Sequence, residues 1–149
     1  ALSSSEILDR ALMLAEQMSG SIARAAANYD LTVPRLELLF VLGLQGECKQ
    51  VELATYLDCS PRQVTALVDG LVASGHVERT MPPDDRRVRL VNLTEKSRRI
   101  VDEVVTARVG LAEWLFEGFG DDELQAFGEV SEKLVSRMSG RALSRLPEQ

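Results

Sequence analysis

Residues 50–94 read QVELATYLDCSPRQVTALVDGLVASGHVERTMPPDDRRVRLVNLT, and this stretch decides the fold of the chain. It contains a short helix, a tight turn at Asp58-Cys59, a second helix, and then two strands joined by an arginine-bearing loop. This order predicts a helix-turn-helix followed by a β-wing, an arrangement that lays its second helix in the major groove of duplex DNA. The simpler alternative, a helical hairpin with a charged and solvated face, leaves the basic strand-turn-strand segment unexplained.

The second helix has clear start and stop signals. Ser60 predicts a capping box, in which its hydroxyl accepts from the N–H of Gln63 and the Gln63 side chain reaches back to the N–H of Ser60. Pro61 suits the first helical position, and Gly75 suits the position just after the last turn. The apolar residues at spacings of three and four predict its buried face: Val64, Leu67, Val68, Leu71 and Val72. In the preceding helix the apolar side is Val51, Leu53, Ala54 and Leu57.

The opposite face of the second helix is the expected DNA-reading surface. Arg62 and Gln63 have planar side chains that can form two hydrogen bonds to one base, Arg to guanine and Gln to adenine. The narrow minor groove attracts arginines such as those of the loop. We expect Asp85 to orient Arg87 through a charge-assisted hydrogen bond. The predicted DNA-contacting residues are Ser60, Arg62, Gln63, Thr65, Ala66, Asp85, Arg86, Arg87 and Arg89.

These segments resemble a known family. The matching residues are Leu53-Ala54, then Ser60-Pro61, Val64-Thr65, Leu67-Val68-Asp69 and Leu71, then Gly75, Val77-Glu78-Arg79, Asp85-Arg86-Arg87 and Leu93-Thr94-Glu95-Lys96. In this spacing they are similar to the MarR family (multiple antibiotic resistance regulators). The chain departs from the family pattern at five positions: Lys49 where a Ser or Thr cap is usual, Ala66 and Gly70 where arginines are common, His76 for an apolar residue, and Ser97 for a glycine.

The resemblance implies a regulator of transcription with an effector pocket. Many family members bind small phenolic or amphipathic anions between the dimer helices and the DNA-binding lobe. The positions that would line such a pocket here are Met18, Ile22, Arg24, Tyr29, Leu36, Phe40 and Val104. Some members sense oxidants through a cysteine in the N-terminal helix, but residues 5–28 contain none. An oxidant-sensing alternative would therefore use Cys48 or Cys59, and Lys49 beside Cys48 is the sequence hint for a reactive thiolate.

Charge is unevenly distributed along the 149 residues. The chain carries a net charge of -6, but residues 49–99 hold nine Lys/Arg and seven Asp/Glu, so the acidic excess lies outside this stretch. A basic lobe suits DNA because phosphate contacts act over about 8–10 Å at physiological salt. The sequence contains no run of 18 apolar residues and no signal-peptide pattern, so we expect a cytoplasmic protein.

Long amphipathic helices are predicted on both sides of the lobe. They cover residues 5–28, Thr94 to about Phe119, and a last segment that Asp121 caps, while the tail from Gly140 is expected to fray at Pro147. Between them, the apolar segment at 34–43 should be buried centrally. The flanking stripes could close a monomeric bundle. We favour a homodimer, because a single helix-turn-helix reads few base pairs and two-fold symmetry matches a palindromic operator.

Other chemistry has little support in the sequence. His76 is the only histidine, so with Cys48 and Cys59 it offers at most three soft ligands at no recognised spacing, and no metal or cofactor is expected. We expect His76 to be half-buried at the start of the wing. No phosphate loop or Ser/His/Asp order indicates an enzyme.

The sequence therefore predicts a mainly α fold with a small β-wing. Residues 34–94 form the winged helix-turn-helix lobe, and residues 1–30 and 95–149 form the dimerisation region. The expected function is that of a homodimeric repressor released from a palindromic operator by a small aromatic or amphipathic effector. The contrasting possibility is a winged helix that binds another protein instead of DNA.

Overall fold

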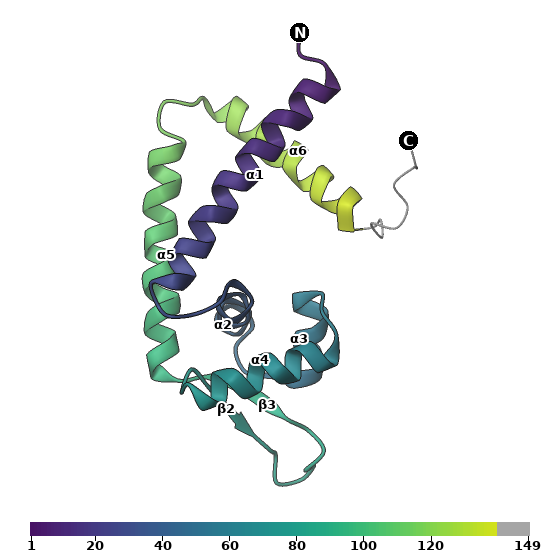
Figure 1. Ribbon diagram of the computed structural model, residues 1–149, viewed down its shortest axis with the longest axis vertical. Coiled ribbons are helices and arrows are strands. Elements are labelled where there is room, and N and C mark those ends of the chain that lie inside the picture. Colours follow the sequence, from purple (N-terminus) through teal and green to yellow (C-terminus); the bar gives the residue numbers. More distant parts are fainter. Residues whose placement is uncertain (140–149) are drawn as a thin grey trace. The chain divides into compact units, whose positions relative to one another are not determined.

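The computed structural model describes residues 1–139, and its ribbon is drawn in Figure 1. The frayed tail expected from Gly140 lies outside these residues. The chain divides into one unit, Ala1–Thr106, and a second that begins at Ala107. The helices and strands are α1 Ser4–Ala27, α2 Val33–Gln45, β1 Cys48–Lys49, α3 Gln50–Leu57, α4 Pro61–Ala73, β2 Val77–Thr80, β3 Leu90–Leu93, α5 Glu95–Leu115 and α6 Asp121–Ser139. Among residues 1–139, no helix is both long and apolar enough to cross a bilayer.

The mainly helical fold with a small β-wing is confirmed. α3 and α4 form the helix-turn-helix, and Asp58 makes the turn between them with a left-handed φ of 50°, a conformation that Asp tolerates better than most residues. The strands form a three-stranded antiparallel sheet in the order β1-β3-β2, whereas the sequence predicted two strands. The missed strand is β1, in which Cys48 pairs with Val91 and Lys49 with Leu90. Two residues are too few to show the alternation by which a strand is recognised.

The core of the first unit is built around α2. As expected for the apolar segment at 34–43, Leu36, Leu38 and Leu39 are at most 2% exposed. Burying one such side chain contributes about 1.5–3 kcal/mol. The other elements contribute Leu53, Val64, Val68, Leu71, Val77, Val91, Leu93, Ile100, Val101 and Val104. Two predicted core residues are wrong, since Val51 is 75% exposed and Val72 is 39% exposed.

Two local predictions near the helix ends need correction. α5 ends at Leu115 and not at Phe119, because Gly118 takes a left-handed φ of 83° in the turn that follows. Asp121 is the first residue of α6 and not its cap, since the Glu123 carboxylate accepts from the N–H of Gly120 at 2.9 Å. The acidic first turn remains favourable to the helix dipole.

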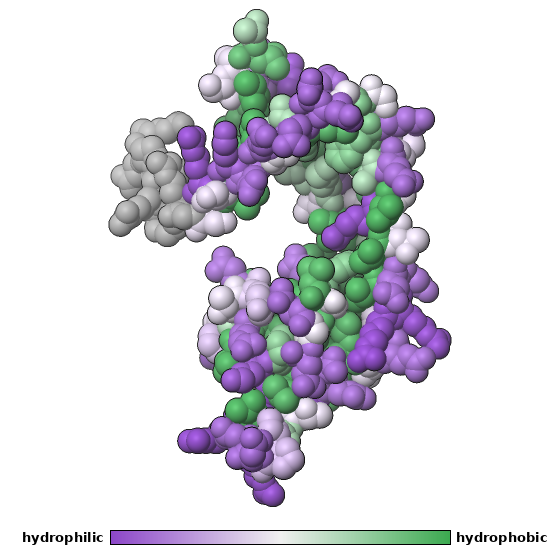
Figure 2. All heavy atoms as spheres, turned by 180° about the vertical axis from the view of Figure 1, so that it is seen from behind, coloured by the Kyte–Doolittle hydropathy of each residue, from purple (hydrophilic) through white to green (hydrophobic). Residues whose placement is uncertain are grey.

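The outer helices leave wide apolar surface exposed. On α1 the exposed apolar residues include Ile7, Leu8, Leu12, Met13, Leu14, Met18 and Ile22. α6 has no buried residue, and Phe127, Val130, Leu134, Val135 and Met138 are between 47% and 72% exposed. Green, apolar surface is visible at the N-terminal end of α1 in Figure 2, whereas the wing is mostly purple. Residues 1–30 belong to the same unit as the lobe.

Candidate nucleic-acid interface

The N-terminus of α4 is fixed by the capping box that the sequence predicted. The N–H of Gln63 donates to Ser60 Oγ at 3.1 Å, and the N–H of Ser60 donates to Gln63 Oε1 at 2.8 Å. Pro61 occupies the first turn. The box aims the first turn of α4 outward and leaves Arg62 exposed, with no hydrogen bond or ion pair to its guanidinium among the residues that the structure describes.

A chain of four hydrogen-bonded side chains crosses the outer face of the lobe. Gln50 Nε2 donates to Thr65 Oγ1 at 3.2 Å, and Arg79 Nε donates to Gln50 Oε1 at 3.0 Å. Arg79 Nη2 completes the chain with an ion pair to Asp69 Oδ1 at 2.6 Å. The network ties α4 to the start of α3 and to β2, so it fixes the angle between the recognition helix and the wing.

Gln50 and Arg79 were not among the site residues predicted from the sequence. A signal for Arg79 was present, because alternation along β2 places it on the same side as the buried Val77. A cation at an inward-facing strand position needs a partner, and Asp69 supplies it. Gln50 carried no comparable signal in the sequence.

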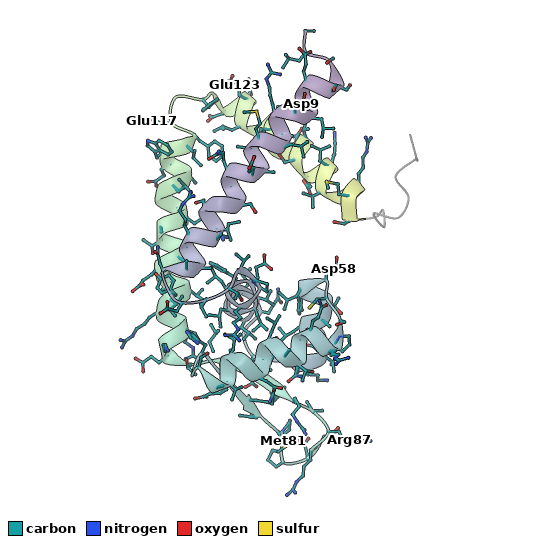
Figure 3. The ribbon with its side chains drawn as sticks, viewed as in Figure 1. Asp9, Asp58, Met81, Arg87, Glu117 and Glu123 are labelled. Carbon is teal, nitrogen blue, oxygen red and sulfur yellow. The ribbon has the colours of Figure 1, made fainter. Side chains whose placement is uncertain are left out.

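The wing presents arginines in a defined conformation. Asp85 Oδ1 accepts from the Arg87 backbone N–H at 3.0 Å and from its Nε at 3.3 Å, the geometry that the sequence predicted. The Arg87 side chain is 94% exposed and lies at the far end of the wing in Figure 3. Arg89 Nη1 donates to the Arg86 carbonyl at 2.6 Å, and the Arg89 carbonyl accepts from the N–H of Gln50 at 2.8 Å. The base of the wing is thus bonded directly to the start of α3.

His76 is buried, at 5% exposure, and not half-buried as predicted. It lies between the end of α4 and the start of β2, where its N–H donates to the Leu71 carbonyl and its carbonyl accepts from the N–H of Thr94. Nδ1 lies 2.6 Å from Ser74 Oγ, while Nε2 has no hydrogen-bond partner among residues 1–139. Burial lowers the pKa of His76, and the positive charges of Lys96 and Arg35 lower it further.

We therefore expect His76 to make stability fall in mild acid. The folded state disfavours the protonated ring, so below the ordinary pKa of 6.5 only the unfolded chain binds this proton. The contribution of His76 to stability should level off about one pH unit above 6.5 and decrease as the pH drops through 6.5 toward the lowered folded pKa. Urea unfolding between pH 5.5 and 7.5 measures this slope. His76→Leu removes the only histidine and should flatten it; a slope that persists in the variant would refute the assignment.

The predicted effector residues do not form one lining. Met18 and Ile22 are about 40% exposed on α1, together with the exposed Arg24, whereas Leu36 and Val104 are buried in the core. Phe40 and Tyr29 are half-buried. The Tyr29 hydroxyl donates to Glu103 Oε2 at 2.6 Å, and this bond raises the pKa of Tyr29.

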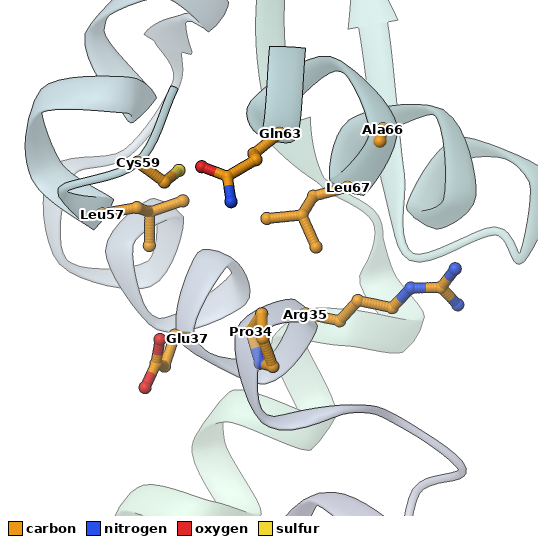
Figure 4. A pocket seen from close by; sticks show the side chains of 8 residues that line it. All are labelled: Pro34, Arg35, Glu37, Leu57, Cys59, Gln63, Ala66 and Leu67. Atoms are coloured by element: carbon orange, nitrogen blue, oxygen red, sulfur yellow. The ribbon is translucent and has the colours of Figure 1, made fainter. Parts of the chain in front are cut away.

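A cavity of about 480 Å³ lies elsewhere in the first unit, between α2, the α3–α4 turn and α4. Its lining residues are Pro34, Arg35, Glu37, Leu57, Cys59, Gln63, Ala66 and Leu67. Figure 4 shows the Gln63 amide and the Cys59 thiol on one side of it. It contains none of the seven predicted effector residues, but it includes Gln63 and Ala66 from the predicted DNA contacts.

The environment of Cys48 argues against the oxidant-sensing alternative at that residue. Lys49 suggested a reactive thiolate, but Cys48 is buried, and burial raises the pKa of its thiol. The carboxylates of Glu52 and Glu47 raise the pKa further. A thiol with a raised pKa is mostly protonated and reacts slowly with oxidants. Cys59 is half-buried beside the cavity and has no disulfide partner.

The fold and this interface define a winged-helix regulator of transcription, and comparison with known proteins identifies the family. A sequence model of the MarR family matches residues 31–88. An uncharacterized HTH-type transcriptional regulator, YsmB of Bacillus subtilis (strain 168), is 35% identical over 113 residues, which cover 74% of this chain and 76% of YsmB. The chain belongs to the MarR family. It is therefore a DNA-binding transcription regulator and not an enzyme.

Two further proteins are similar to this chain. The HTH-type transcriptional repressor IacR of Pseudomonas putida is 25% identical over 112 residues, which cover 75% of this chain and 67% of IacR. The crystal structure of a MepR-like protein complexed with pseudoligands matches 93% of this chain and 98% of its own, at 27% identity and a TM-score of 0.63.

Proposed function

We propose that this chain is a homodimeric cytoplasmic repressor that binds a palindromic operator. In this proposal residues 34–94 form the DNA-binding lobe, with the start of α4 in the major groove and Arg86 or Arg87 in the minor groove. The observation that carries it is the exposed cationic surface of the lobe. Arg62 is exposed in the first turn of α4, and the Arg87 side chain is 94% exposed at the wing tip. Asp85 holds the Arg87 side chain in place, whereas the Arg62 guanidinium is unpaired within residues 1–139, so both cations are available to phosphates and base edges.

The dimer is supported by the apolar faces of the outer helices. Monomeric proteins rarely expose contiguous apolar patches larger than a few hundred Å². Within residues 1–139, α1 and α6 each carry a row of exposed apolar side chains that no surface of their own unit covers. We assign these faces, in residues 1–30 and 95–149, to contacts with a second copy. Two-fold symmetry then presents two recognition helices to half-sites about 34–36 Å apart.

Selection from a random duplex library tests DNA recognition. The intact chain should enrich inverted repeats whose half-site centres are about one helical turn apart, and affinity should fall steeply with salt. Enrichment of sequences without two-fold symmetry would contradict the palindromic operator. If no duplex is enriched at low salt, the protein-binding alternative for the winged helix takes precedence.

Regulation by a small effector is the further part of the proposal. The MepR-like relative was crystallised with pseudoligands, and IacR is a repressor, which supports the same behaviour here. We place the effector near Tyr29, at the junction of α1 with α2. The Glu103 carboxylate bonded to Tyr29 makes this place unfavourable for an anion, so a neutral aromatic compound fits it better than the anion that the family suggests.

We expect the effector and the operator to weaken each other equally. If the effector favours a spacing of the recognition helices that misfits DNA, linkage requires one coupling factor in both directions, typically about 5–150-fold. Compounds are first found by displacement of operator from a panel of neutral and anionic aromatics. Calorimetry of the best compound, with and without saturating operator, then measures the factor. Equal affinities in the two titrations would exclude this allosteric account.

A further inference from the structure

Arg35, in the first turn of α2, lies across the recognition helix at Gly70. A Cβ atom added to Gly70 would lie 2.5 Å from Arg35 Nη2 and 3.0 Å from Arg35 Cζ. Both distances are shorter than van der Waals contact allows, so the guanidinium occupies the space that a side chain at position 70 would fill. Glycine at this position of α4 gives a side chain from another helix access to the surface of the recognition helix.

The guanidinium of Arg35 has no partner in the part of the chain that the structure describes. Its backbone N–H donates to Thr32 Oγ1 at 3.4 Å, but no hydrogen bond or ion pair uses its side-chain nitrogens. In Figure 4 the side chain extends past the cavity, and its charged end points away from Leu57 and Cys59. An arginine that is only partly exposed normally finds a carboxylate or carbonyl. Here the positive charge is available to an external anion.

Arg35 approaches α4 from the side that the wing does not use. Thr65 and Asp69 are bonded to Gln50 and Arg79 on the wing side of α4. At 3.6 residues per turn, Gly70 lies across the exposed face from Thr65. A helix in the major groove has a phosphate strand on each side, so the wing side and the Gly70 side face different strands. Lys96, which donates to the Ser74 carbonyl, adds a second cation near the C-terminal end of α4.

We propose that Arg35 is a phosphate-binding residue that holds the DNA strand on the side of α4 away from the wing. It contributes charge and position but no base reading, because it touches the flank of α4 and not the first turn. Gly70 is the matching position on α4, since any larger residue there would displace the guanidinium. This inference rests on the proposed binding of operator DNA.

The test is a double-mutant cycle of Arg35→Gln and Gly70→Ala, read by the salt dependence of operator binding. Loss of one phosphate contact per protomer should reduce the slope of log affinity against log salt by about 0.9 per site, or about 1.8 per dimer. Gly70→Ala should cause the same reduction by moving the guanidinium, and the double variant should be no weaker than Arg35→Gln alone. Because α4 is helical at Gly70, Gly70→Ala should also raise Tm by a few degrees.

The controls separate this inference from the function on which it rests. Arg99→Gln removes an exposed arginine that is paired with Glu95 on α5, and it should leave the slope unchanged. Arg87→Ala removes a wing arginine and should reduce the slope if DNA binding occurs as proposed. If the wild type and Arg87→Ala behave as expected but Arg35→Gln keeps the wild-type slope, Arg35 is a packing residue only. If the wild type binds no duplex, both proposals fail. Additive losses in the double variant would also overturn the role of Gly70.

Discussion

Leu134→Asp should convert the proposed homodimer to a monomer and abolish tight operator binding. Leu134 is 48% exposed in the single chain, within the apolar row of α6 that includes Val130 and Met138. A carboxylate placed in the centre of a subunit interface must be desolvated without a partner, which costs several kcal/mol for each copy, and a two-fold axis places two copies in one interface. A monomer reads one half-site, so affinity for the full palindrome should fall by at least about 10³-fold, in the range that separates specific from non-specific binding. Light scattering at micromolar concentration and a shift assay measure the two effects.

Ser136→Asp is the matched control for this substitution. It adds the same carboxylate two residues along α6, and the helical period places it away from the row of Val130, Leu134 and Met138. This variant should remain dimeric and bind operator normally. A wild-type chain that scatters as a monomer, or a Leu134→Asp variant that remains a dimer, would show that the α6 face has another role.

Features that depend on a local pattern were predicted well from the sequence. The capping box at Ser60 and the Asp85–Arg87 pair each depend on residues two or three positions apart, and both are present with the predicted bonds. The central position of α2 followed from its apolar composition. Capping and hydrophobic periodicity depend on residues that are close together in the sequence. These features can therefore be predicted without knowing how distant parts of the chain pack.

The features that were missed depend on partners far away in the sequence. Gln50 joins Thr65 and Arg79, which are 15 and 29 residues away, and no pattern within either segment indicates that bond. The burial of His76 results from packing against neighbouring elements of the fold. Its polar ring is accommodated because Ser74 Oγ lies 2.6 Å from Nδ1.

Two departures from the MarR pattern have physical explanations in the fold. Ser97 stands where the family has glycine, yet it is fully buried, and its hydroxyl donates to the Thr94 carbonyl at 3.1 Å. Gly70 stands where an arginine is common, and the guanidinium of Arg35 fills the adjacent space. A sequence comparison at single positions shows only that the family residue is absent at positions 70 and 97. In the structure, the Ser97 hydroxyl is hydrogen-bonded and the Arg35 guanidinium lies in the space beside Gly70.

The structure also changes which residue of α4 is better suited to read a base. Gln63 and Arg62 were both predicted readers, but Gln63 Oε1 accepts from the N–H of Ser60 at 2.8 Å. A two-point contact with adenine needs both the oxygen and the nitrogen of the Gln63 amide, so it would compete with the capping box for the oxygen. Arg62 makes no such bond within residues 1–139, and its position in the first turn is the one that meets base edges in helix-turn-helix proteins.

We therefore expect Arg62→Ala to remove sequence preference at one operator position. The loss should be about 1–3 kcal/mol per half-site, roughly 5–150-fold, and it should disappear on operators already substituted at that base pair. Arg62→Lys keeps the charge but not the planar fork, so it should retain the salt slope and still lose the preference. Gln63→Ala should instead lower Tm through the lost cap and leave base preference intact. Titrations of the three variants against single-base operator variants show whether Arg62 or Gln63 reads the base. A changed base preference in Gln63→Ala but not in Arg62→Ala would identify Gln63 as the base-reading residue instead.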